Sequence, residues 1–352
     1  MHGIRKAEQR ARWALAGLWL AADAALDQPD EAANPAEERP QFWYGGQAVI
    51  EGVMMRGQYV AAVAVRHPKG AIVTREVPLN AALYRGRIAR LPFVRGLVLL
   101  WDALGLGTRA LMWSADVALE EDEDIEFSLQ SAAGMGLVVL SLALGIGLFF
   151  VLPAAISAGI QHLAGFESRF AADVIEGAVK LALLIGYIWA IGLMPDVKRL
   201  YGYHGAEHKT INAYEDGAEL TPEVTKNYSL EHPRCGTAFL LTLVVLSVLI
   251  HMLTGRPESV PMLLLSRVGL IFPIAGIAYE VLRFTAAHVE HPAIRVLIKP
   301  NLALQHLTTR EPDRQMREVA IVALQRVLAA ERAAQPLAAE RVSSEEVVAA
   351  AD

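Results

Sequence analysis

Four long apolar blocks constrain this chain more than any other feature of its sequence. They cover residues 132–156, 174–194, 236–253 and 260–282. A helix needs about 20 apolar residues to cross the hydrocarbon core of a bilayer, and each block approaches or exceeds that length. Charged residues make up only 20% of the chain, which is below their share in soluble domains. Apolar residues make up 54%, which is above it. The sequence predicts an integral membrane protein with about four transmembrane helices.

Two of these blocks contain charged residues, and the third block, 236–253, contains His251. Glu176 and Lys180 lie one helical turn apart near the start of the second block, where they can pair or reach towards an interface. The fourth block contains Arg267 and Glu280. An ionisable group inside a membrane span is costly and indicates a function by default. Glu280 lies near the end of its block, so simple exposure at the interface is an equally open interpretation.

The basic residues between the blocks predict the orientation. They concentrate in the middle loop 195–235 and in the segment after the fourth block: Lys198, Arg199, Lys209, Lys226, Arg234, Arg283, Arg295 and Lys299. Because positive residues favour the cytoplasmic side, we expect a multi-pass protein of the cytoplasmic membrane with both termini in the cytoplasm. Residues 11–22 resemble a signal-peptide core. This segment is short and the predicted topology keeps the N-terminus inside, so we expect it to be retained.

The remaining segments complete an α+β membrane protein with a small N-terminal β-rich domain and amphipathic or interfacial helices. A β-hairpin is predicted where residues 59–66 and 71–77 flank a His-Pro-Lys-Gly turn. Residues 91–113 carry Arg95, Asp102 and Arg109 on one helical face, which favours an amphipathic helix in the interface or against the bundle. The predicted parts are an N-terminal helix and flexible linker (1–40), a small β-rich cytoplasmic domain (41–90), an amphipathic interfacial helix and acidic connector (91–131), a four-helix transmembrane region (132–295) with its cytoplasmic His/Glu/Cys loop (195–235), a C-terminal cytoplasmic helix (296–334) and a disordered tail (335–352).

The start of the C-terminal helix has its own signal. Thr308 and Thr309 precede Pro312, which is typical of a threonine cap followed by a proline in the first turn. Apolar residues then recur at helical spacing as far as about residue 334. We therefore expect the helix to begin at this threonine pair.

The segment most informative about chemistry contains His204, Glu207 and His208, an H-x-x-E-H pattern. On a helix, positions i, i+3 and i+4 lie on one face. Two imidazoles one turn apart can bind one divalent metal, and the carboxylate between them can act as a general base on water. The plainer alternative is a helix whose histidines bond to the backbone or to lipid headgroups. We predict a metal site, with zinc as the metal and Glu207 as the catalytic base.

A third ligand must come from elsewhere in the chain. Cys235 and His232, just before the third block, rank first, and Glu280 ranks behind them. His288 and His291 follow the fourth block and belong to the same predicted membrane face, although an interfacial position suits them better. Cys235 has an equal alternative as a small buried thiol at a helix start. A structural zinc site takes four ligands, whereas a catalytic one keeps a position open.

Three motifs together resemble signatures of the YqhQ family, bacterial membrane proteins of undetermined function that are described as metal-dependent enzymes. The motifs are GGQAVIEGVMMRG at 45–57, HGAEHK at 204–209 and HPRCGT at 232–237. The similarity extends from about residue 44 to 328 and includes 307–312. The resemblance implies a shared fold and a bound metal, and it implies no substrate.

The first of these motifs allows two interpretations. Its glycines permit close backbone approach, and Glu51 or Arg56 can be presented to the metal site or to an anionic headgroup. Alternatively, the segment is a strained sheet corner in which Glu51 and Arg56 pair with each other. It lacks the spacing of a phosphate-binding loop.

Composition narrows the function classes. A net charge of -6 argues against a nucleic-acid partner, and a single cysteine excludes a disulfide framework. The leading hypothesis is a hydrolase that cuts a peptide or lipid-linked bond at the cytoplasmic face, with membrane lipid as its surroundings. The alternatives are a membrane scaffold or assembly factor with a structural His/Cys metal site, and a His-rich redox-metal enzyme, for which the histidines are too few. The substrate and the oligomeric state stay open.

Overall fold

The computed structural model describes residues 44–84, 86–118, 132–165, 168–255, 257 and 259–349. The predictions for residues 1–40 and for the acidic run 120–126 lie outside the described residues. The described residues all belong to the compact unit that begins at Phe42.

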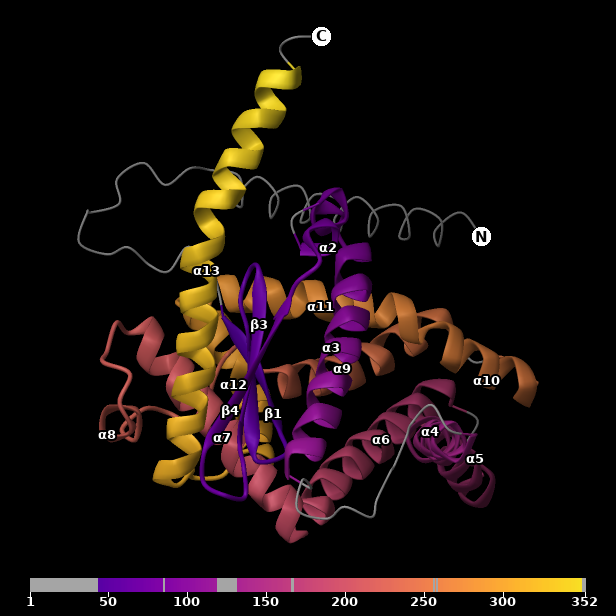
Figure 1. Cartoon of the computed structure of the whole chain (residues 1–352). Coiled ribbons are helices and arrows are strands. Elements are labelled where there is room, and N and C mark those ends of the chain that lie inside the picture. Colours follow the sequence, from indigo (N-terminus) through magenta and orange to yellow (C-terminus); the bar gives the residue numbers. More distant parts are fainter. Residues whose placement is uncertain are drawn as a thin grey trace. The chain divides into compact units, whose positions relative to one another are not determined.

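A four-stranded antiparallel sheet opens the described chain, with the strands in the order β1-β2-β3-β4 (Figure 1). The strands are β1 (Gly45–Val49), β2 (Gly52–Arg56), β3 (Val60–Arg66) and β4 (Ile72–Pro78). The predicted hairpin is confirmed, since β3 pairs with β4 and Arg66 faces Ile72 across its end. Gly70 in the connecting turn has a φ of 91°, a conformation that glycine adopts without steric cost.

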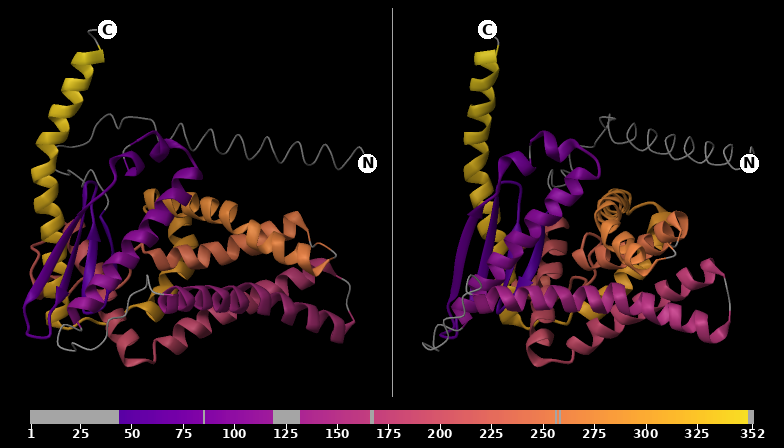
Figure 2. Two further views of the ribbon diagram at one scale, coloured as in Figure 1. Left: turned by 45° about the vertical axis from the view of Figure 1, so that its right-hand side comes forward. Right: turned by 90° about the vertical axis from the view of Figure 1, so that its right-hand side faces the viewer.

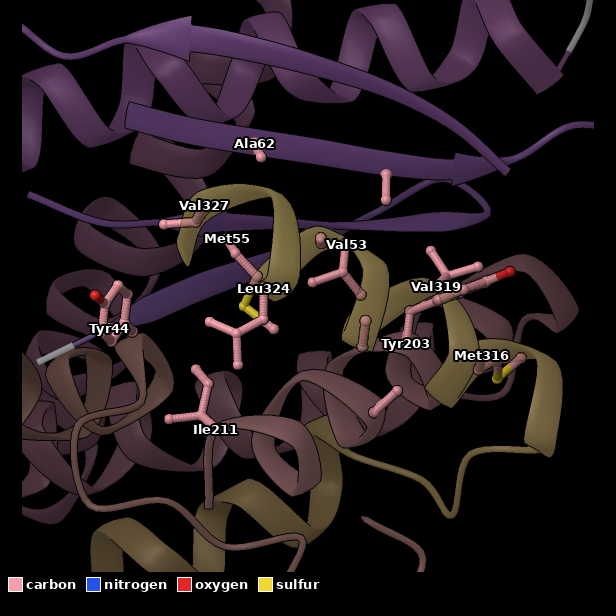
Figure 3. Packing of buried hydrophobic residues seen from close by; sticks show 14 residues of the cluster. Tyr44, Val53, Met55, Ala62, Tyr203, Ile211, Met316, Val319, Leu324 and Val327 are labelled. Carbon is pink, nitrogen blue, oxygen red and sulfur yellow. The ribbon is translucent and has the colours of Figure 1, made fainter. Parts of the chain in front are cut away.

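Both faces of the sheet are covered by helices. Helices α7 (Pro195–Glu215) and α13 (Arg314–Ala349) pack against one face, and α3 (Val94–Ala118) packs against the other (Figure 2). Figure 3 shows Leu324 of α13 lying between Met55 of the sheet and Ile211 of α7. Because both faces are buried, β2 and β3 are almost continuously apolar instead of alternating.

The apolar blocks form a second group of helices. They are α4 (Ala132–Ile146), η2 (Gly147–Val151), α5 (Leu152–Ala164), α6 (Arg169–Ile191), α9 (Gly236–Thr254), α10 (Val260–Gly269) and α11 (Ile271–Ala287). Within the described residues, four stretches are long and apolar enough to cross a membrane: Val139–Ala164, Phe170–Ile191, Gly236–Thr254 and Leu265–Ala287. The predicted number of such helices is confirmed. Many of their large apolar side chains are exposed, Leu163 and Leu253 among them.

The amphipathic helix expected over 91–113 is α3. It buries Leu106 and Ala110 against the sheet, and Gly96 lies against the ring of Tyr279 in α11. Of the three ionisable residues expected on one face, Arg95 pairs with Glu280 of α11. This helix therefore packs between the sheet and the apolar helices.

The C-terminal region differs from its prediction in two respects. The expected helix 296–334 is divided into α12 (Pro292–Thr308) and α13. Thr309 ends α12, with its hydroxyl donating to the Gln305 carbonyl at 2.8 Å. Asp313 caps α13 instead, because its carboxylate accepts the Met316 amide at 2.8 Å. The prediction of a threonine cap was wrong, since an aspartate directly after a proline competes for the same role.

Helix α13 also continues to Ala349, past residue 335 where disorder was expected. Alanine and glutamate, which are strong helix formers, recur in this segment. Three short helices complete the described chain: α2 (Ala81–Tyr84), η1 (Arg87–Arg90) and α8 (Pro222–Thr225).

Candidate metal centre

The H-x-x-E-H motif lies in the middle of α7. Pro195 occupies the first turn of this helix, where its missing N–H costs no hydrogen bond. Helical periodicity then places His204 and His208 one above the other, with ring centroids 4.4 Å apart. This is the helical arrangement that the spacing predicted.

Backbone carbonyls orient both imidazole rings. Nδ1 of His204 donates to the Thr308 carbonyl at 2.8 Å, and Nδ1 of His208 donates to the Leu230 carbonyl at 2.5 Å. A carbonyl oxygen can only accept, so the proton of each neutral ring is on Nδ1 and the lone pair is on Nε2. Histidines that bind metals are usually oriented by such a hydrogen bond from their other nitrogen. Nε2 of His208 is buried and has no hydrogen-bond partner among the described residues.

Cys235 completes a three-atom cluster with these two rings. Its Sγ lies 3.2 Å from Nε2 of His204, and the ligand atoms of His204, His208 and Cys235 all lie within 4.8 Å of one another. A tetrahedral zinc ion separates such atoms by about 3.3–3.6 Å, given its usual bond lengths. Two imidazoles and one thiol therefore suit a zinc ion by donor type, and the side chains would have to shift by about 1 Å to reach its usual bond lengths.

Hydrogen-bond donors at the start of α9 surround the sulfur of Cys235. Cys235 is the N-cap of α9, and its Sγ accepts the Thr237 amide at 3.5 Å. The Thr237 hydroxyl is 3.1 Å from the same sulfur. These contacts fix the sulfur at the start of α9.

Glu207 lies beside this cluster and outside it. One carboxylate oxygen is 3.8 Å from Nε2 of His204, and the same oxygen has no hydrogen-bond partner among the described residues. Burial raises the pKa of Glu207 to about 7, against the opposing effects of His204 and of a hydrogen bond from the Gly46 backbone. A Cβ added at Gly46 would lie 2.8 Å from Cγ of Glu207, so only glycine permits this approach of β1 to α7.

The loop that supplies the Leu230 carbonyl is fastened to the same helix. Lys209 donates to the carbonyls of Lys226 and Tyr228 at 2.7 and 2.8 Å. Asn212 donates to the carbonyls of Ser229 and Glu231, both at 3.0 Å. Neither Lys209 nor Asn212 was predicted from the sequence to support the site. The sequence shows that these residues follow His208 by one and four positions. It does not show their partners, because these are 17–19 residues away and reach them only when the loop is folded.

His232 lies near the cluster but is engaged elsewhere. Its ring centroid is 5.6 Å from that of His208. Nε2 of His232 accepts an N–H of Arg234 at 3.1 Å, and the Arg234 guanidinium also pairs with Glu215. Burial is the main cause that lowers the pKa of His232 to about 4. The ring is therefore neutral, and the nitrogen that a metal would need already accepts a hydrogen bond.

The structure does not bring the other candidate ligands to the cluster. Glu280 accepts a hydrogen bond from Nε of Arg95 at 2.8 Å. His288 bonds to the carbonyl of Phe284 in its own helix, and His291 is the N-cap of α12.

Glu51 and Arg56 do not pair with each other. Glu51 occupies the turn between β1 and β2 with a φ of 52°, and its carboxylate accepts hydrogen bonds from Arg199 at 2.6 Å and Tyr203 at 3.1 Å, both in α7. Arg56 lies over the ring of Tyr84, 5.6 Å from its centroid. Glu51 therefore ties the sheet to α7, whereas Arg56 reaches a cavity beside the cluster.

This cavity has a volume of about 610 Å³. His204, Glu207 and Cys235 line one side of it, and Gln47 and Arg56 line another. Its wall is formed by the sheet and by helices α3, α6, α7 and α9. The volume lies within the range of small-molecule sites, about 300–1,000 Å³.

Comparison with known proteins places the chain in a family. Residues 91–330 match the family model described as "Protein of unknown function (DUF1385)". The chain is 33% identical over 295 residues to "Uncharacterized protein YqhQ" of Bacillus subtilis (strain 168), a match that covers 81% of this chain and 92% of the relative. No solved structure matches the chain.

The chain belongs to the DUF1385 family, which includes the Bacillus YqhQ protein. The resemblance drawn from the three motifs is confirmed.

Proposed function

We propose that this protein is a membrane enzyme that uses one zinc ion, held by His204, His208 and Cys235, to hydrolyse a peptide or lipid-linked bond at the cytoplasmic face. The observation that carries the proposal is the convergence of two imidazole nitrogens and one sulfur within 4.8 Å. The unpartnered carboxylate oxygen of Glu207 next to them adds support.

The membrane placement rests on four apolar helices with exposed side chains. The metal cluster lies at one end of these helices, since Cys235 begins α9 and the chain runs directly from α6 into α7. Together with the positive residues of 195–235, this supports a site at the cytoplasmic interface.

The residues divide into four roles. His204, His208 and Cys235 would hold the zinc ion, which would supply Lewis acidity to a water molecule. Thr308 and Leu230 hold the imidazole rings through their carbonyls. Glu207 is placed to accept the proton of the attacking water, because burial raises its pKa towards neutrality. Arg56 and Arg234 line the cavity and provide positive charge for an anionic substrate group.

The non-enzymatic alternative needs a fourth protein ligand. His232 was the candidate for it, and its Nε2 already accepts a hydrogen bond from Arg234. The donor set therefore favours a three-ligand catalytic site over a closed structural one.

Metal analysis of detergent-purified protein tests the proposal. We expect about one zinc per chain in the wild type and its loss in His204→Ala, which removes one of three ligands. His306→Ala is the matched control, because the side chain of His306 is 61% exposed and pairs with Glu231. Glu207→Gln should retain the metal and lose hydrolysis of peptide and lipid substrates.

Cobalt substitution adds a direct test of the thiolate. Wild-type protein loaded with Co²⁺ should show a sulfur-to-metal charge-transfer band that Cys235→Ser abolishes. If the wild-type protein binds neither zinc nor cobalt, both the enzyme hypothesis and the structural-zinc hypothesis are refuted.

A further inference from the structure

A second cavity lies between the apolar helices. Its volume is about 310 Å³, and its wall is almost wholly apolar. Residues of η2, α6, α9, α10 and α11 line it, most of them within the stretches long enough to cross a membrane.

Helix α9 lines this cavity with a single face. Its lining residues are Leu240, Leu243, Val244, Ser247 and His251. Their spacing of three and four is that of one helical face. From Leu240 to His251 this face is about 16 Å long at the usual helical rise.

The second cavity adjoins the cavity of the metal centre. Tyr187 and Ile188 of α6 and Leu240 of α9 line both of them. Cys235 and Thr237, which precede Leu240 in the chain, line the cavity of the metal cluster. A ligand can therefore extend along α9 from the metal cluster into the apolar space.

Charged residues also line the apolar cavity, at the end away from the metal cluster, but they leave its surface apolar. Arg267 bonds to both carboxylate oxygens of Glu176 at 3.0 Å, and Lys180 bonds to Glu176 at 2.9 Å. These charged groups thus bond to one another, and the surface that faces the cavity consists of apolar groups. Nε2 of His251 has no hydrogen-bond partner among the described residues.

We propose that this apolar cavity binds the hydrocarbon chain of a lipid, whose polar end reaches the cluster of His204, Glu207 and Cys235. This proposal narrows the substrate of the proposed hydrolase to a lipid-linked compound. The claim that the lipid is a substrate rests on the proposed function. Binding of the chain itself does not require the metal.

A peptide fits this space poorly. Its backbone amides and carbonyls cost free energy when buried without partners. Ser247 is one hydroxyl in the wall, and it already donates to the Val244 carbonyl at 2.7 Å. A hydrocarbon chain needs no such partners and gains from burial.

Photo-crosslinking in detergent tests the proposal with a fatty acid that carries a diazirine at its chain end. Peptides of α6 and α9 that line the cavity should be labelled. Val244→Trp fills the cavity and should reduce this labelling at least tenfold. Val245→Trp is the matched control, because Val245 is 48% exposed on another face of α9. It should leave the labelling unchanged.

Ser247→Phe serves as a second blocking variant, so that a folding defect in Val244→Trp does not decide the result. Each variant is compared only if it elutes as a single species. Excess unlabelled palmitate and excess farnesol then compete separately, which distinguishes an acyl from an isoprenoid chain. Labelling confined to exposed positions such as Val245 and Leu249, or unaffected by both blocking variants, overturns the proposal.

His204→Ala separates this inference from the proposed function. It should lose the metal and keep the labelling of the apolar cavity. A wild-type protein that binds the metal but no hydrocarbon chain would refute only this inference. A wild-type protein that binds the chain but no metal would refute only the proposed enzyme function.

Discussion

At the scale of residues, the cluster depends on two carbonyl oxygens as much as on its ligands. Thr308 and Leu230 each accept the Nδ1 proton of one ring, and they thereby direct both Nε2 atoms to one place. Gly205 lies between the two histidines along α7. Its missing side chain lets the backbone at Arg310 approach the helix closely.

Gly205→Ala should therefore disturb the site without changing a ligand. The new Cβ would lie 2.2 Å from the Arg310 carbonyl oxygen and 2.8 Å from Cδ2 of Leu230. We expect a loss of about 1–3 kcal/mol of stability, as for other overpacked positions, and lower zinc content. Thermal unfolding in detergent and metal analysis measure both. Gly186→Ala is the control, because nothing lies within 4 Å of a Cβ at Gly186. Equal behaviour of the two variants would contradict this account.

At the scale of elements, the buried ion pairs fix α6 against α10. Arg267 is only 1% exposed and bonds to Glu176 and, at 3.4 Å, to Asp173. In a low-dielectric interior, such charges are tolerated only when paired. This contact fastens the start of α6 to α10, at the end of α6 opposite the site.

Arg267→Met should destabilise the protein strongly. The substitution removes the guanidinium that bonds to Glu176 and Asp173, and breaking a buried pair costs about 3–5 kcal/mol. A lower midpoint of thermal unfolding in detergent is the expected result. Arg109→Met, at an exposed position of α3, should change the midpoint little. An unchanged midpoint in Arg267→Met would show that the ion pairs contribute no net stability.

At the scale of the whole molecule, the proposed orientation places the metal centre and both termini in the cytoplasm. The loops before α6 and before α10 then face outwards, and they contain the exposed residues Ser168 and Ser259. Asp216, exposed at the end of α7, lies on the inner side.

Cysteine labelling in intact cells tests this orientation in a Cys235→Ser background, which removes the single native cysteine. A membrane-impermeant maleimide should label Ser168→Cys and Ser259→Cys from outside. Asp216→Cys should be labelled only after the cells are permeabilised. The reverse pattern would invert the proposed topology and place the metal centre outside.

The sequence by itself determined the local features of this protein. Apolar length predicted four long helices, the His-Pro-Lys-Gly turn between residues 59–66 and 71–77 predicted the β3–β4 hairpin, and the spacing of His204, Glu207 and His208 predicted one helical face. These features depend on contacts between residues close in the chain, which periodicity reports directly.

Tertiary structure decided which distant residues meet. Cys235 and His232 were equal candidates in the sequence, and the fold brings the sulfur of Cys235 to the rings while Arg234 occupies His232. The Thr308 carbonyl reaches His204 across 104 positions of sequence. Such contacts depend on how helices pack, and helix packing depends on side-chain shapes across the whole core, which no local pattern encodes.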